Sequence, residues 1–175
     1  MKISTNPIES AFGILKQYKT LADKALEQVS DEEFFRPPEP ESNSIAIIVK
    51  HVNGNLLSRW TDFLTTDGEK ESRDRDEEFE MDTMERSQLM QMWERSWQCL
   101  FSSLEALTRD DLGKIVTIRS EPHSVLAAIH RTMTHICSHV GQIVFIAKMF
   151  KSGQWQTLTI AKRKSKEFNE TMSRS

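Results

Sequence analysis

Cysteine is scarce in this sequence, because only Cys99 and Cys137 occur among 175 residues and no CxxC pair is present. Neither a disulfide framework nor a zinc site built from cysteine pairs is therefore indicated. A protein that carries so few thiols fits the reducing cytoplasm, and we expect that location.

Long apolar runs are also missing, since every apolar-rich window contains Lys, His or Gln. The first residues, MKISTNPIESAFG, lack the apolar segment of a secretory signal. We therefore expect neither a membrane span nor export. An excess of basic charge is absent too, because the formal net charge is −3. This charge argues against general nucleic-acid binding, and the short basic stretch AKRKSK near the C-terminus is too small to change that expectation.

Glycine and proline are few, at six and five residues, and three of the prolines fall within residues 36–40. The long segments between these breakers carry apolar residues at steps of three and four, which predicts helices. The expected helices span residues 6–29, 44–66, 82–107 (or 83–107) and 124–150. Their expected N-caps are Asn6, Ser44, Asp82 or Thr83, and Ser124. A short β-like run is expected only at 115–118.

Four long helices, each with one apolar stripe, predict an all-α four-helix bundle. The charged link 67–82 reaches about 50 Å when extended, whereas a 24-residue helix is about 36 Å long. The link can therefore run back along the bundle, which permits parallel second and third helices. We expect one domain over residues 1–155, followed by a basic tail or short helix over 156–175.

The stretch HRTMTHICSHVGQI (130–143) places His135 and His139 four residues apart, about 40° from each other around a helix. Two imidazoles at this spacing can bind one ion, as in zinc peptidases. The peptidase glutamate is missing, because Ile136 follows His135. A bare pair is also compatible with histidines at the edge of a core that bind carbonyl groups or water.

A third histidine, His51, lies at the edge of the apolar stripe of the second helix. Three edge histidines on two helices favour a shared divalent metal site with open positions for water or substrate. His130 lies about 140° from His135 around the helix and Cys137 about 200°, so neither is an expected ligand. His123, beside Pro122 in a polar connector, is expected at the surface.

Polar neighbours of the three histidines are candidates for substrate binding. Asn55 and Gln142 stand one helical turn from a histidine, where they can orient water or substrate. Arg131 and Arg59 can bind an anionic substrate group. The alternative, that these are ordinary polar residues at a helix edge, stays open.

The charged link is most simply a solvated crossover, although Arg73, Arg75 and Phe79 can fold back over another part of the protein. In a bundle, the crossover can also line the mouth of a site. Trp60, Trp93 and Trp97 stand at helical spacing and are expected in the core or at an interface.

The second-helix segment SIAIIVKH, the charged crossover and the extension HxxxHVGQI together resemble the DinB/YfiT-like family of bacterial metalloproteins. The resemblance covers about residues 5–152 and is closest to a branch catalogued as a domain of unknown function. It implies a four-helix bundle of up-down-down-up order and frequent homodimers. It also implies a divalent metal, zinc, nickel or iron, on His51, His135 and His139. Gly141 matches the family pattern as a small residue that allows close helix packing.

Characterised relatives in that family use low-molecular-weight thiols such as bacillithiol or mycothiol. A site of three histidines could lower the pKa of bound water or hold a thiol as thiolate. Our first hypothesis is therefore a metal-dependent thiol transferase or a related hydrolase-like enzyme. The alternatives are a non-catalytic metal-binding or dimeric sensor bundle, and an interaction module without metal. Because only neutral imidazole binds metal, we expect occupancy to fall below a pH of about 6.5.

Overall fold

The computed structural model describes residues 5–80 and 83–172 of the chain. The protein is mainly α-helical, as predicted. The helices are α1 (Pro7–Leu26), α2 (Asp31–Phe35), α3 (Ile45–Trp60), α4 (Arg86–Ala106), α5 (Val125–Lys151) and α6 (Ser165–Met172). A hairpin of β1 (Ile115–Ile118) and β2 (Glu121–Ser124) and three short 3-10 turns, η1 (Glu77–Phe79), η2 (Arg109–Asp111) and η3 (Ser152–Gln154), complete the described elements. The β-like run predicted at 115–118 is confirmed as strand β1.

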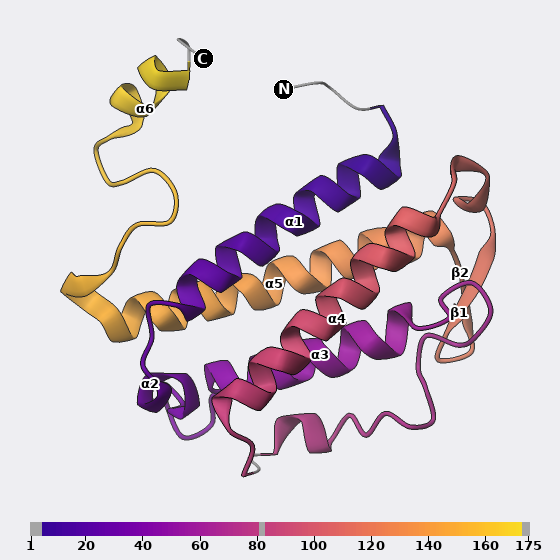
Figure 1. Cartoon of the computed structure of the whole chain (residues 1–175), viewed down its shortest axis with the longest axis horizontal. Helices are drawn as coiled ribbons and strands as arrows, with labels where there is room; N and C mark the ends of the chain where they lie inside the picture. Colours follow the sequence, from indigo (N-terminus) through magenta and orange to yellow (C-terminus); the bar gives the residue numbers. More distant parts are fainter. Residues whose placement is uncertain (1–4, 81–82, 173–175) are drawn as a thin grey trace.

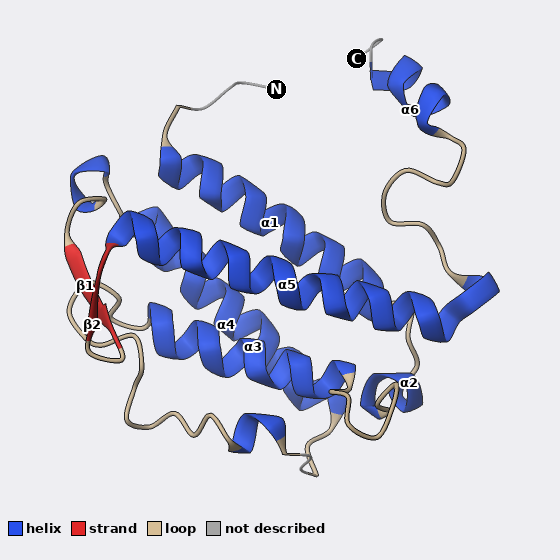
Figure 2. Ribbon diagram, turned by 180° about the vertical axis from the view of Figure 1, so that it is seen from behind, coloured by secondary structure: helices blue, strands red, loops and turns tan. Residues whose placement is uncertain are grey.

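Four long helices, α1, α3, α4 and α5, lie against one another (Figure 1). The colour order along the chain shows α3 and α4 running in one direction and α1 and α5 in the other. The charged crossover leaves the end of α3 and returns beside that helix to the start of α4, which is the path that its length permits. Figure 2 shows the hairpin at the end of the molecule where α3 ends and α5 begins.

The helix starts follow local capping chemistry. Asn6 accepts a hydrogen bond from the backbone N–H of Ile8, and Ser44 and Ser124 accept equivalent bonds at α3 and α5. These three predicted caps are confirmed. The start predicted for α4 was wrong at Thr83, because Glu85 and Gln88 form a reciprocal capping pair. The alternative cap, Asp82, lies outside the described residues.

Helix α3 ends at Trp60, earlier than the predicted residue 66. The chain turns at Asp62, which adopts a left-handed backbone with φ 49°. The carbonyl oxygen of Asp62 accepts the backbone N–H groups of Thr65 and Thr66, so this local turn replaces further helix. The consequence is that the crossover starts close to the hairpin.

The core between the four helices is apolar and rich in tryptophan. Trp60, Trp93 and Trp97 are buried, which confirms their predicted place. Trp93 and Trp97 pack edge to face, and the Trp93 indole N–H donates to Asp23 of α1 at 2.9 Å. Gly141, by contrast, does not allow close packing within the chain, because a Cβ there would meet nothing within 4 Å.

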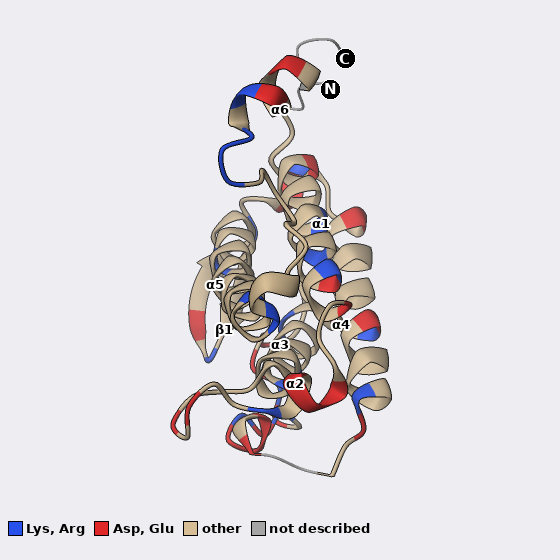
Figure 3. Ribbon diagram, turned by 90° about the vertical axis from the view of Figure 1, so that its left-hand side faces the viewer, with Lys and Arg blue, Asp and Glu red and all other residues tan. Residues whose placement is uncertain are grey.

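Charged residues divide unevenly over the surface. Acidic residues gather on α2 and along the crossover, and basic residues on the segment before α6 (Figure 3). Among the described residues, no helix combines the length and the apolar character that crossing a bilayer requires.

Candidate metal centre

Two helices present matching polar ladders at steps of four residues. On α3 the ladder is His51, Asn55 and Arg59, and on α5 it is Arg131, His135 and His139. Because α3 and α5 run in opposite directions (Figure 1), the histidine ends of the two ladders meet, and so do their arginine ends. The spacing of four residues, together with the antiparallel packing of α3 and α5, therefore places three imidazoles together and two guanidinium groups beside them.

The three imidazoles converge through their Nε2 atoms. His135 Nε2 lies 3.1 Å from His51 Nε2 and 3.2 Å from His139 Nε2. All three ligand atoms lie within 4.8 Å of one another. Two ligand atoms of a tetrahedral ion with metal–nitrogen bonds of about 2.0–2.1 Å are separated by about 3.3 Å. The spacing of the Nε2 atoms is therefore close to that of a first coordination shell.

The other ring nitrogens fix the protonation pattern of two imidazoles. His51 Nδ1 lies 2.9 Å from Glu78 Oε2, and His139 Nδ1 lies 2.8 Å from Gln142 Oε1. Both oxygens accept, so each Nδ1 must carry the hydrogen, and each neutral ring then directs an Nε2 lone pair at His135. A single hydrogen on His135 Nε2 can satisfy only one of them. A cation satisfies all three lone pairs, so the residues present fit a divalent metal.

Glu78, in turn η1, links the crossover to α3 through its hydrogen bond with His51. Its carboxylate also accepts two hydrogen bonds from the Arg73 guanidinium, at 2.7 and 2.8 Å. Burial alone would raise the pKa of Glu78, but the bonds from Arg73 and His51 hold that pKa below its usual range. The Phe79 ring covers the His51 imidazole, with 4.8 Å between ring centroids.

Burial and the neighbouring imidazoles favour the neutral forms of His135 and His139. Burial, followed by the neighbouring imidazoles of His139 and His51, lowers the pKa of His135 to about 3. Burial also lowers the pKa of His139, although its bond to Gln142 opposes the shift. Protons therefore compete with metal at His135 at a lower pH than the value of about 6.5 expected from an ordinary imidazole pKa.

A pocket of about 500 Å³ opens beside the three histidines. Asn55, Arg59 and Arg131 line it, as does Phe79 from the crossover. Gln142 is exposed and is not among the residues that line the pocket. Its side chain instead binds Nδ1 of the His139 ring. The structure thus brings Asn55 and Arg131 to the pocket, whereas Gln142 contacts His139.

The other histidines lie apart from this cluster. His130 is exposed and His123 is half-buried in β2, where its Nε2 lies 3.9 Å from Glu121. Neither belongs to the possible metal-binding group found among the described residues.

The sequence model of one family, described as "Protein of unknown function (DUF1572)", matches residues 2–164. The chain belongs to this family. A search of curated proteins found no match. The DUF1572 match extends beyond residue 152, where the resemblance noted above ends, and includes the first part of the tail.

Arg119 lines the pocket, and Glu69 pairs with Arg119 and Arg73. The sequence of this DUF1572 member did not identify Arg119, Glu69 or Glu78 as part of the site. Each lies in a polar stretch whose composition indicates solvated loop, and no periodicity shows which side chain turns inward. The one available signal was Phe79, an apolar residue in a charged run. The suggestion that Arg73 and Phe79 fold back over another part of the protein agrees with the contact of Arg73 with Glu78 and of Phe79 with His51.

Proposed function

We propose that this DUF1572 member is a metal-dependent enzyme that transfers a low-molecular-weight thiol, of the bacillithiol type, to an electrophilic substrate. We also propose that its helices form the up-down-down-up bundle of the DinB/YfiT-like type. The observation that carries the proposal is the convergence of three Nε2 atoms beside an open pocket. A purely structural cluster would not need the pocket.

The chemistry divides between an ion and the chain. A divalent ion supplies Lewis acidity and favours the thiolate form of a nearby thiol at neutral pH. His51, His135 and His139 would hold the ion, and Glu78 orients His51 through Nδ1. In the transfer, a sulfur–carbon bond forms, the leaving group departs with the electron pair of its bond to that carbon, and the thiol proton passes to solvent. Asn55, in the pocket wall, can donate to the leaving group.

Two further expectations accompany this proposal. Both cysteines are free, which supports a reducing compartment such as the cytoplasm. We also propose a homodimer, supported by exposed Phe145 and Met149 one turn apart on α5. Sedimentation analysis tests the dimer, and a monomer at all concentrations would refute it.

Metal analysis tests the centre directly. Protein purified without a histidine tag is reconstituted with zinc, nickel or iron, and the metal bound per chain is measured. We expect close to one ion per chain, and less than about 0.2 would refute the metal centre. His139→Ala should lose the ion, whereas His130→Ala, an exposed histidine on the same helix, should retain it.

Turnover separates the enzyme from the alternative. The metal-loaded protein is incubated with bacillithiol and a panel of electrophiles, and the loss of free thiol is followed. We expect loss that depends on the metal and is abolished in His139→Ala. Full metal occupancy without turnover would instead favour a non-catalytic sensor bundle.

A further inference from the structure

Arginine dominates the wall of the pocket. Five guanidinium side chains line it, from Arg59, Arg73, Arg75, Arg119 and Arg131. The carboxylates that pair with them are Glu69 and Glu78. With neutral histidines, the formal charges of these seven side chains sum to an excess of positive charge beside the candidate metal centre.

Ion pairs within the protein neutralise only part of the positive charge of these arginines. The guanidinium group of Arg73 is paired within the protein, because it binds both oxygens of Glu78 and also contacts Glu69 at 3.2 Å. Glu69 is then shared with Arg119 at 3.3 Å and Arg59 at 3.8 Å. Arg131 is exposed and forms no ion pair among the described residues. Arg59, Arg119 and Arg131 are thus left with less than one carboxylate between them.

Arg59 carries the clearest sign of a missing partner. Its side chain is 9% exposed, and its buried Nη1 has no hydrogen-bond partner among the described residues. Burial, and then the positive charge of Arg131, lowers the pKa of Arg59 to about 10, despite the opposing effect of Glu69. A buried guanidinium nitrogen without an acceptor is costly, so a ligand that supplies an acceptor would bind there favourably.

The two ladders place this charge at a defined distance from the histidines. Along α5, Arg131 is one turn from His135, about 6 Å, and along α3, Arg59 is two turns from His51, about 12 Å. One small molecule can therefore reach from the arginines to the histidines within the pocket. Guanidinium groups match the planar or tetrahedral oxygens of carboxylates and phosphates.

We propose that the pocket binds an oxyanion group of the substrate, a carboxylate or a phosphate, between Arg59 and Arg131. This inference rests on the proposed function, because it assigns the chemical class of the substrate that binds beside the three histidines. The oxyanion anchors the molecule at the arginine end, and Asn55 lies between the two ends on α3.

Binding of simple oxyanions tests the proposal without any turnover. Full-length protein, both metal-loaded and after chelation, is titrated with inorganic phosphate or succinate by calorimetry at constant ionic strength in chloride. We expect saturable binding of at least one of them in both forms, and the preferred one identifies the group. Arg131→Gln and Arg59→Met should each weaken binding about tenfold or more. Arg95→Gln removes an exposed arginine of α4 outside the pocket and should change binding less than about twofold.

Stability measurements distinguish a binding role from a structural one. If Arg59 serves the ligand, Arg59→Met should leave the melting temperature unchanged or raise it, since it removes a buried charge that Glu69 compensates only in part. A lower melting temperature together with unchanged oxyanion affinity would overturn the proposal. So would the absence of saturable binding, or equal weakening in Arg95→Gln. His139→Ala should keep oxyanion binding in the chelated form, so a failure of the metal centre would be recognised separately.

Discussion

Gly54 of α3 lies where the crossover approaches the helix most closely. A Cβ at this position would overlap Oε1 of Glu78 and lie 2.7 Å from its Cδ. Such an overlap is tolerable where the end of a side chain can move aside. The Glu78 carboxylate cannot move cheaply, because Arg73 and His51 both hold it and the residue is 6% exposed. Glycine is therefore required here by space rather than by backbone conformation.

We expect Gly54→Ala to displace Glu78 and release the acceptor of His51 Nδ1. Loss of a carboxylate that orients a ligand histidine weakens metal binding by about 10–100-fold, and we expect a decrease of that size in a competition titration with a chelator. Gly141→Ala is the matched control on α5, because a Cβ there meets no atom. It should retain metal affinity and stabilise the helix by up to about 1 kcal/mol. Equal affinity in both variants would show that Glu78 does not support the ligand.

The crossover is the element that turns two helix ladders into an enclosed site. At its start, Asp67 accepts the backbone N–H groups of Arg119 and Ser120, both at 2.8 Å. These residues form the hairpin turn with φ 56° and 63°, a left-handed conformation that costs non-glycine residues energy. Backbone N–H groups of Glu69, Ser120 and Arg119 lower the pKa of Asp67 to about 2, so this attachment persists through neutral pH. Near its end, Glu78 makes the second attachment.

Arg73 binds Glu78 and also Glu69, which pairs with Arg119 of the hairpin turn. Removal of Arg73 should loosen the segment without unfolding the helices. We expect Arg73→Gln to leave the helical circular dichroism unchanged and to increase cleavage within residues 67–80 in limited proteolysis with a protease specific for acidic residues. Metal affinity should fall by about tenfold, because Glu78 loses its anchor. Arg75→Gln is the control, since exposed Arg75 stacks on Phe79 and forms no ion pair with another residue that the structure describes. Unchanged cleavage in Arg73→Gln would contradict this role.

The elements differ in how far the sequence could predict them. Apolar periodicity located the helices, and side-chain capping located the starts of α1, α3 and α5. Spacing of four placed His135 beside His139, and edge position selected His51 as their partner. The crossover could not be predicted in this way, because Glu78 is one of eight acidic residues in DGEKESRDRDEEFE, and its contacts with Arg73 and His51 set it apart.

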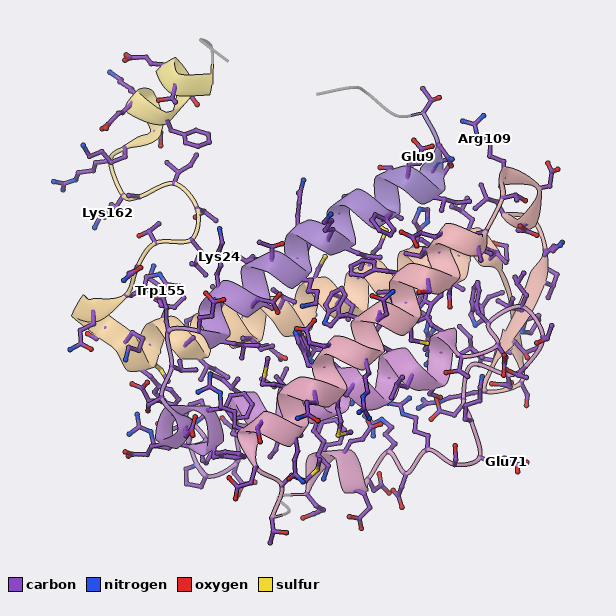
Figure 4. All side chains as sticks on the ribbon, viewed as in Figure 1. Glu9, Lys24, Glu71, Arg109, Trp155 and Lys162 are labelled. Atoms are coloured by element: carbon purple, nitrogen blue, oxygen red, sulfur yellow. The ribbon has the colours of Figure 1, made fainter. Side chains whose placement is uncertain are left out.

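At the scale of the whole molecule, the first residues of the C-terminal segment contact the helices, whereas its last residues are exposed. Trp155 and Leu158 pack against the core, and Gln156 exchanges two hydrogen bonds with Gln28, at 2.8 and 3.1 Å. Beyond them the chain leaves the helices, and Figure 4 shows Lys162 on this outer segment, pointing away from them. Residues 165–171 of α6 are exposed. The boundary expected at residue 155 stays a prediction, and the contacts of Trp155, Gln156 and Leu158 give it a direct test.

Two truncations test where the stable unit ends. A chain that ends at residue 159 keeps Trp155, Leu158 and the bonds to Gln28, so we expect its melting temperature to stay within about 2 °C of the full chain. A chain that ends at Gln154 exposes the core surface under Trp155 and Leu158, and should melt roughly 5 °C lower or more in scanning calorimetry. Both should bind metal, because His51, His135 and His139 lie outside the removed segment. A large loss of stability in the longer chain would instead show that the segment containing α6 contributes to the fold.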